Sequence, residues 1–199
     1  MELRSNFAVP DFIDYLCRHS PHLNDILRLS YTTRLQCSIC HDSKDTTLKL
    51  YIPKYSSLVD LVDYNTKALL KDGDAVHCSK CGTNTAHSAI YEYSPDIFII
   101  ELVRVTESKS NWIKNALPID FSVTSLKLPN FDRSYRVVGS CHHRGSLRGG
   151  HWFTKMVTSS GWYELDDLKS TNSRSQMPGQ RDQTVAVLLL VSEAKFKPQ

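Results

Sequence analysis

The stretch "HWFTKMVTSSGWYELDD", residues 151–167, predicts a β-hairpin and points to a fold dominated by strands. Apolar and polar residues alternate in both halves, which is the pattern of half-buried strands. "TSSG", residues 158–161, separates the halves with turn-forming residues. The hairpin starts at His151, directly after two glycines, and ends at a pair of aspartates. A single histidine is most often a solvated or locally hydrogen-bonded side chain, so the hairpin alone assigns it no role.

Further strands are predicted around this hairpin. They are "TTRLQC" (32–37), "TLKLYIP" (47–53), "HSAIYEYS" (87–94), "DIFIIELVRV" (96–105), "LPIDFSV" (117–123), "SYRVVGSCHH" (134–143) and "QTVAVLLLVS" (183–192). Their short, closely spaced pattern favours a largely antiparallel arrangement. Two polar stretches, 106–116 and 169–182, are expected to be loops.

Two segments have helical spacing instead. Residues 11–29 form the first, which Pro21 interrupts, and residues 57–70 form the second, with Ser56 or Ser57 as its N-cap. The sequence therefore predicts an α+β chain in which strands predominate.

Composition argues against two kinds of partner. The 199 residues carry a formal charge of only +3, and the basic residues are scattered, so we expect no nucleic-acid partner. No stretch approaches the ~18 apolar residues of a membrane span, and the longest apolar run, residues 184–191, has the length of a buried strand. The opening residues contain no apolar signal segment, so we expect a cytoplasmic or nuclear location.

Four of the six cysteines form two Cys-x-x-Cys pairs, Cys37 with Cys40 and Cys78 with Cys81. Such pairs supply the four thiolates of a tetrahedral structural Zn²⁺ site, whose closed shell leaves no position for catalysis. A redox motif and unrelated buried thiols are the alternatives, but a redox pair would occur once, before a helix. Metal bonds would offset the entropy of closing the long intervening loop.

In this order the motifs resemble the catalytic core of the ubiquitin-specific proteases, which are papain-like cysteine deubiquitinases. The resemblance runs from about residue 6 to residue 193. The matching segments are "CSIC", "SLVDL", "CSKC", "PDIFIIELVR", "PIDFSV", "YRVVGSCHHRG", "GGHW", "WYELDD" and "AVLLLV". Each motif is weak alone, and nine in the family's order are specific.

The resemblance implies a papain-like α+β fold that lacks most of the family's thumb. Residues 6–30 would be a helical remnant at the junction of thumb and palm. Residues 31–92 would be the zinc-clipped fingers, with one inserted helix. Residues 93–193 would be the β-rich palm that carries the remaining site residues.

The resemblance also implies roles for the residues of the hairpin. His151 would act as the base that takes a thiol proton, and Asp166 would fix the tautomer of its ring. Asp167 would give nearby support. The structural alternative for the two aspartates is a strand-end turn with solvated carboxylates.

Substrate contacts follow from the same resemblance. Gly149 and Gly150 would leave a narrow passage for the Gly-Gly tail of ubiquitin, and Trp152 replaces the family's usual tyrosine. Asp11, in "VPDFIDYL", would also contact substrate, whereas Ala8 stands where the family has an acidic residue.

The family's "G-N-T-C" box, which carries the nucleophilic cysteine, does not occur in these 199 residues. Cys17 falls inside a predicted helix, where core packing is expected. Cys141 is also expected to be packing, although "CHHRG", residues 141–145, is predicted to form a loop near the active centre. We therefore expect the chain alone to retain the histidine and the aspartate without a nucleophile.

Three functions remain open at this stage. The chain is a fragment of a ubiquitin-specific protease, a pseudoprotease that binds ubiquitin or a ubiquitinated protein, or a zinc-ribbon module for nucleic acid. The last is the weakest, because it requires a basic surface with stacking aromatic residues.

Overall fold

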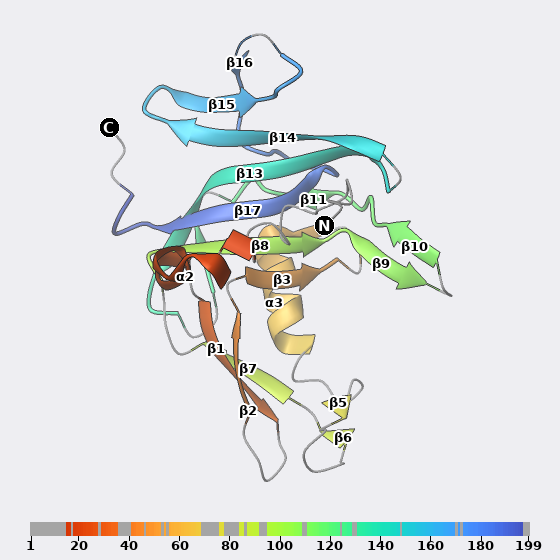
Figure 1. Cartoon of the computed structure of the whole chain (residues 1–199), viewed down its shortest axis with the longest axis vertical. Helices are drawn as coiled ribbons and strands as arrows, with labels where there is room; N and C mark the ends of the chain where they lie inside the picture. Colours follow the sequence, from red (N-terminus) through yellow and green to blue (C-terminus); the bar gives the residue numbers. More distant parts are fainter. Residues whose placement is uncertain are drawn as a thin grey trace.

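The computed structural model describes residues 15–196, except positions 17, 28, 36–40, 46, 53, 55, 69–75, 78–83, 86, 92–94, 109–110, 124, 129–130, 148, 170 and 172. Strands dominate it and helices are few (Figure 1). The expectation of a β-rich α+β fold is therefore confirmed. No helix among the described residues is long and apolar enough to cross a membrane.

An eight-stranded sheet forms the body of the molecule, with the strand order β16-β15-β14-β13-β17-β8-β3 and with β12 paired to β13 (Figure 1). Its strands are β3 (Thr47–Tyr51), β8 (Ile97–Val103), β12 (Leu126–Lys127), β13 (Ser134–Ser146), β14 (Gly149–Thr158), β15 (Gly161–Leu165), β16 (Ser173–Arg174) and β17 (Val185–Ser192). All of its pairs are antiparallel except β3 with β8. The predicted antiparallel character is confirmed.

The main core lies on one face of this sheet. β8 and β17 are central and nearly continuous in apolar residues, as strands covered on both faces are. Phe98, Ile100 and Leu188 are fully buried on the core face. Helix α3 (Leu58–Ala68) packs Leu58 and Leu61 into the same cluster.

The N-terminus of α3 has the expected cap. The Ser57 hydroxyl accepts a hydrogen bond from the Asp60 N–H at 3.1 Å and donates one to the Asp60 carboxylate at 2.8 Å. Each residue thus provides a hydrogen-bond partner for the other, as in a capping box. Helix α2 (Pro21–Leu27) begins at the proline predicted to interrupt the first helical segment, and Ser20 accepts from the Leu23 N–H at 3.4 Å. Proline is favoured at this first position, because an N–H there would have no partner within the helix.

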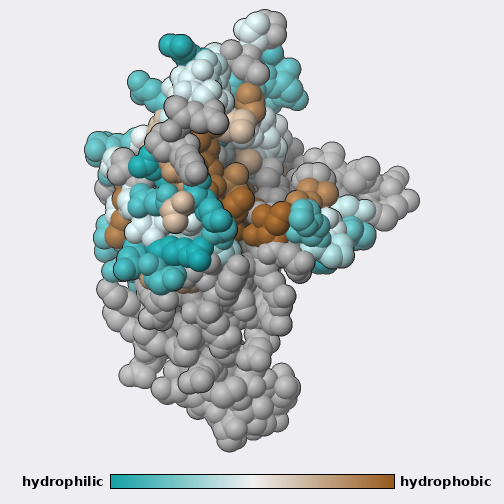
Figure 2. Space-filling model, turned by 90° about the vertical axis from the view of Figure 1, so that its left-hand side faces the viewer, coloured by the Kyte–Doolittle hydropathy of each residue, from teal (hydrophilic) through white to brown (hydrophobic). Residues whose placement is uncertain are grey.

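The opposite face of the sheet carries a smaller cluster. Ile99 and Val187 are buried there, while Leu189 is 37% exposed. Figure 2 shows apolar surface gathered in a band on one side of the molecule, next to hydrophilic surface.

A second region contains the strands that flank the cysteine pairs in sequence. β1 (Leu29–Leu35) pairs with β2 (His41–Asp45) and with β7 (His87–Tyr91), and β5 (Val76–His77) pairs with β6 (Asn84–Thr85). These strands lie below the large sheet in Figure 1. The sequence between β1 and β2 contains the first cysteine pair, and that between β5 and β6 contains the second. The cysteines themselves lie outside the described residues.

Two expectations about loops are wrong. Residues 106–116 contain most of a β-hairpin, formed by β9 (Val105–Ser108) and β10 (Asn111–Lys114). Residues 141–145 form no loop, because β13 continues through them to Ser146. By contrast, the described residues of the expected loop at 169–182 form the two-residue strand β16 and one isolated bridge, from Asp182 to Ile119. Two further short strands, β4 (Ser56–Ser57) and β11 (Ile119–Asp120), form a parallel pair.

Strand β13 carries two irregularities against β17. The pairing register shifts between Val137 and Gly139, and shifts back between Cys141 and His142. Two residues of one strand oppose one residue of its partner at such a bulge. The pairing of β13 with β14 is regular throughout.

Arg104 joins the centre of the sheet to the neighbouring loop. Its side chain is buried, and its Nε donates to the carbonyl of Val185 at 2.9 Å. Its Nη1 donates to the carbonyl of Leu117 and, at 3.4 Å, to that of Asn115, while its Nη2 reaches the Asp182 carbonyl at 3.4 Å. Burial lowers the pKa of Arg104 to about 10, so the group stays charged at neutral pH.

Candidate active site

The β14–β15 hairpin brings its two ends together. Thr158 pairs with Gly161 across the turn, and Gly161 has a φ of 111°, a conformation that glycine adopts readily. The register runs back to Thr154 opposite Leu165. The predicted hairpin of residues 151–167 is therefore confirmed.

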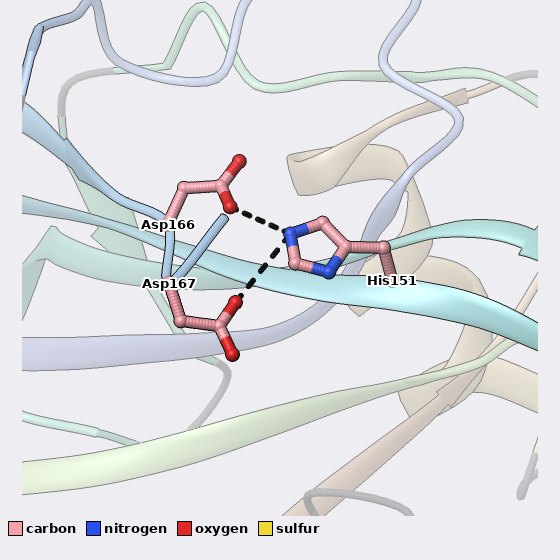
Figure 3. Close-up of side chains that lie close together, drawn as sticks. All are labelled: His151, Asp166 and Asp167. Atoms are coloured by element: carbon pink, nitrogen blue, oxygen red, sulfur yellow. Dashed lines mark hydrogen bonds and ion pairs between the residues drawn. The ribbon is translucent and has the colours of Figure 1, made fainter. Parts of the chain in front are cut away.

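His151 and Asp166 meet at the open end of this hairpin (Figure 3). Nε2 of His151 lies 2.7 Å from Oδ1 of Asp166, within hydrogen-bond distance. The same carboxylate oxygen accepts a hydrogen bond from the Leu168 N–H at 3.0 Å, and the Asp166 side chain is only 4% exposed. The predicted contact between these residues is confirmed, whereas their catalytic roles stay predictions.

The carboxylate of Asp166 is kept ionised. Burial alone would raise its pKa, but the hydrogen bonds from His151 and from the Leu168 N–H hold the pKa below the ordinary value of 3.8. An ionised carboxylate at Nε2 favours the tautomer that carries its proton there. Nδ1 is then the nitrogen with a free lone pair, which is the chemical requirement for a general base.

Asp167 points its carboxylate toward the same ring from further away (Figure 3). Its Oδ1 lies 3.8 Å from Nε2 of His151, and its side chain is 87% exposed. Such a group adds a screened charge and no hydrogen bond at this distance.

The three side chains also have donor types that bind metal ions, and their nearest donor atoms lie within 4.8 Å of one another. In a tetrahedral zinc shell, however, neighbouring ligand atoms are about 3.3 Å apart, as bonds of 2.0–2.1 Å require. The 2.7 Å separation of Nε2 and Oδ1 is that of a hydrogen bond. The arrangement therefore suits proton transfer better than metal binding.

Aromatic rings on the same face of the sheet pack next to His151. Phe153, two residues along β14, stacks on His151 with ring centroids 6.5 Å apart and stacks on His142 at 4.6 Å. The guanidinium of Arg144 lies 4.1 Å from the Phe153 ring centroid. No role was predicted for these three supporting residues from the sequence. Their alternation along β13 and β14 was the available signal, but it requires knowledge of the register.

His142 is fully buried beneath this stack. Its Nδ1 lies 2.9 Å from the Thr184 hydroxyl, and its Nε2 lies 2.8 Å from the Ser140 hydroxyl. Burial lowers the pKa of His142 to about 4, against the opposing charge of Asp182. The ring is therefore neutral at pH 7, and both of its nitrogens have partners.

The two glycines before His151 differ in their surroundings. A Cβ on Gly149 would meet no atom within 4 Å, whereas one on Gly150 would lie 2.2 Å from Nε2 of His143 and 2.4 Å from the Arg144 carbonyl. Packing within the chain thus requires glycine at 150. The passage for a ubiquitin tail predicted at these glycines stays a prediction.

Cys141 and Trp152 lie on the face opposite His151. Cross-strand partners share a face, and Cys141 pairs with Thr154 while His151 pairs with Arg144, an odd number of positions away. The Cys141 sulfur lies 3.6 Å from the Thr154 hydroxyl. Burial raises the pKa of this thiol, so the structure neither aims it at His151 nor activates it.

Cys141, Trp152 and Thr154 line an open pocket of about 460 Å³, together with Asp166, Asp167 and Lys169. Trp152 also packs against the smaller cluster of Ile99 and Val187. The Trp152 ring therefore covers part of the sheet face that carries this smaller cluster.

The remaining predicted site residues lie outside the described residues. They are the proposed substrate contact Asp11, the neighbouring Ala8, and the zinc ligands Cys37, Cys40, Cys78 and Cys81. Cys17, which was expected to pack in the core, lies outside the described residues as well.

Comparisons with known proteins agree with this geometry. The family model described as ubiquitin carboxyl-terminal hydrolase matches residues 14–190. The chain is 24% identical, over 191 residues, to the "Probable ubiquitin carboxyl-terminal hydrolase 4" of Schizosaccharomyces pombe, an alignment that covers 84% of this chain and 30% of that relative.

Solved structures show the same fold. The SAGA Ubp8/Sgf11/Sus1/Sgf73 DUB module bound to ubiquitin aldehyde superposes with a TM-score of 0.68 at 19% identity, over 92% of this chain and 48% of the matched one. A variant of the yeast SAGA DUB module gives a TM-score of 0.66 at 21% identity, over 84% and 41%. The chain thus spans less than half the length of each relative named here. Since the family model covers most of this sequence, the chain belongs to the ubiquitin carboxyl-terminal hydrolase family, as a ubiquitin-specific protease-type core.

Proposed function

We propose that this chain is the fingers-and-palm part of a ubiquitin-specific protease, and that it presents His151 and Asp166 as the base and its orienting carboxylate. The hydrogen bond between Nε2 of His151 and Asp166 carries the proposal, because it leaves Nδ1 of the ring to accept a proton. In such a site a thiol would lose its proton to Nδ1, and its sulfur would attack the carbonyl carbon of the last glycine of the ubiquitin tail. The C–N bond to the substrate amine would then break, the amine would leave with the proton from Nδ1, and water would hydrolyse the resulting thioester.

We further propose that this chain lacks the nucleophile. The 199 residues contain no Gly-Asn-x-Cys box, and Cys141 lies on the wrong face with a raised pKa. Without a thiolate near Nδ1, no acyl-enzyme forms. This chain on its own is then a ubiquitin-binding module, and it becomes hydrolytic only where another segment supplies the cysteine.

Ubiquitin is the proposed partner. One of the matched modules is bound to ubiquitin aldehyde, which is a property of that protein. For this chain, the family membership and the open space beside Gly149 support binding of the ubiquitin tail. We propose no nucleic-acid or membrane partner, and a cytoplasmic or nuclear location.

A structural Zn²⁺ ion is also proposed, held by Cys37, Cys40, Cys78 and Cys81. Four thiolates in two Cys-x-x-Cys pairs are a donor set that zinc prefers. The antiparallel pairs β1–β2 and β5–β6 support this, because each joins the strands on either side of one cysteine pair. Zinc there would fix the fingers and take no part in proton transfer.

A ubiquitin probe with a C-terminal propargyl group tests the missing nucleophile, and calorimetry with unmodified ubiquitin tests binding. We expect no covalent adduct, together with binding in the micromolar range or weaker. An adduct that disappears in Cys141→Ala or in Cys17→Ala would show that the chain has its own nucleophile. Absence of any measurable ubiquitin binding would refute the binding role.

A further inference from the structure

Lys114 ties the β9–β10 hairpin to the end of β13, just before the turn that leads to His151. From the end of β10, its Nζ lies 2.6 Å from the carbonyl oxygen of Gly145 and 3.2 Å from that of His143. The same Nζ lies 3.0 Å from Nδ1 of the His143 ring. One ammonium group thus contacts three acceptors on β13, within the last residues before the chain turns into β14.

The His143 ring, in turn, contacts β14 on both sides of His151. Its Nε2 occupies the space in which a Cβ on Gly150 would lie, only 2.2 Å from that position. Its ring centroid is 4.7 Å from that of Trp152. His151 is the residue between these two contacts, so the placement of its backbone depends on where the His143 ring sits.

We propose that Lys114 and His143 form a latch that positions the start of β14, and with it His151, and that the latch opens when His143 is protonated. Both are positioning residues, since neither contacts His151 directly in the hydrogen bonds described. The latch itself does not depend on the proposed function, and only the meaning of His151 as a base rests on it.

Protonation breaks the latch for a simple reason. Nδ1 accepts a hydrogen bond from the Lys114 ammonium only while the ring is neutral, with its proton on Nε2. A protonated ring would place a second cation 3.0 Å from Nζ and leave Nδ1 without a lone pair.

The surrounding charges keep the latch closed near neutral pH. Burial first, and then the charge of Lys114, lower the pKa of His143 below 6.5. Lys114 faces the ring from β10. Burial first, and then the charge of Arg104, which directly follows β8, lower the pKa of Lys114 in turn. Arg144 and His151 lie on the opposite face of their strands. Opening is therefore expected as the pH falls below 6.5.

Nuclear magnetic resonance of the full chain tests the latch without ubiquitin. The Hα resonances of Gly150 report the His143 ring current, and amide hydrogen exchange at residues 149–151, corrected for intrinsic rates, reports opening. The pH is lowered from 7.5 until the His143 ring resonances themselves have titrated. Over that titration we expect the Gly150 shift to move toward its random-coil value and the exchange protection to fall severalfold. An unchanged Gly150 shift and unchanged protection after the His143 ring resonances have titrated would overturn the latch.

Variants separate the latch from a general loss of structure. Lys114→Met removes the donor and keeps the side-chain stem, so the open-state signals should appear already at pH 7.5. His143→Gln retains an acceptor that does not titrate, and should abolish the pH dependence that accompanies titration of the His143 ring in the wild type. Wild-type signals in Lys114→Met, or persistent pH dependence in His143→Gln, would contradict the proposal.

The two glycines provide a matched pair. A Cβ in Gly150→Ala would meet both the His143 ring and the Arg144 carbonyl, so the variant must displace both and should reproduce the open-state signals of their neighbours. Gly149→Ala meets no atom and should leave the His151 signals in place. Equal effects from both would refute the role of the ring. A wild-type chain that fails to bind ubiquitin would refute the proposed function and leave every one of these readouts as it stands.

Discussion

Replacing Arg104 with methionine should be among the most destabilising single changes in this chain. Methionine keeps much of the side-chain volume and removes every donor. The guanidinium has two short hydrogen bonds, to the carbonyls of Val185 and Leu117, and two weaker ones at 3.4 Å. A hydrogen bond to a charged group contributes about 1.5–3 kcal/mol, and a buried carbonyl left without a donor costs a similar amount.

Counting only the two short bonds, we expect Arg104→Met to lower the free energy of unfolding by about 4 kcal/mol. That is a large share of the roughly 5–15 kcal/mol that stabilises a typical domain. Urea unfolding at pH 7.5, followed by tryptophan fluorescence, measures the difference. If Arg104→Met leaves too little folded protein, Arg104→Lys keeps the charge without the planar fork and should show an intermediate loss.

Arg133 provides the control. It forms an exposed ion pair with Asp96 at 2.6 Å, with side chains 38% and 45% exposed, and such pairs contribute about 0–1 kcal/mol. Arg133→Met should therefore change stability by less than about 1 kcal/mol. A loss below about 1.5 kcal/mol in Arg104→Met, or equal losses in both variants, would refute the conclusion that the hydrogen bonds of Arg104 hold the sheet and the neighbouring loop together.

Three further predictions concern protonation, orientation and metal. The pKa of His142 is about 4 in the folded chain and about 6.5 when unfolded, so the unfolded state binds more protons between these values. The free energy of unfolding should therefore fall by up to ~3 kcal/mol as the pH drops from 6.5 toward 4. Urea midpoints should show this fall for the wild type and a smaller pH slope for His142→Gln, and equal slopes would contradict the prediction. In Asp166→Ala the ¹⁵N spectrum of the His151 ring should change from one tautomer to a mixture, while Asp167→Ala should retain a single tautomer; the reverse order would argue against the orienting role of Asp166. Elemental analysis should find one zinc per chain, lost in Cys37→Ser and kept in Cys17→Ser, and zinc-free wild-type protein would rule out the proposed ligand set.

Local features were the ones that the sequence predicted well. The hairpin of residues 151–167, the serine cap of α3 and the helix break at Pro21 each depend on neighbours a few residues apart. The contact of His151 with Asp166 followed from the hairpin and from the family's motif order. Short-range hydrogen bonds and side-chain alternation decide such features, and both are visible in sequence.

Features held by distant residues were missed. The β9–β10 hairpin reads as a polar loop because it has little core to cover, with Trp112 65% exposed and Ile113 50% exposed. Lys114 reaches the end of β13, about thirty residues away, and Arg104 reaches the Val185 carbonyl in β17. Alternation in a single strand does not reveal which distant groups lie opposite.

The paired bulges between β13 and β17 have a consequence for how members of this family can be compared. Tyr135 and Val137 face the main core, and side chains alternate between the two faces along β13. The first register shift moves each later side chain to the face opposite the one that this alternation would give it. The pairing of β14 with β13 is regular, so the side chains of β14 alternate in step with this shifted pattern. The face on which His151 lies therefore depends on the register shift at Val138, thirteen residues upstream. A relative with one residue fewer at that point would retain the Gly-Gly-His motif and yet turn its histidine to the side that Cys141 and Trp152 occupy here. Residue identity at the motif is thus an incomplete criterion for activity, and the spacing between the core pattern and the motif has to be matched as well.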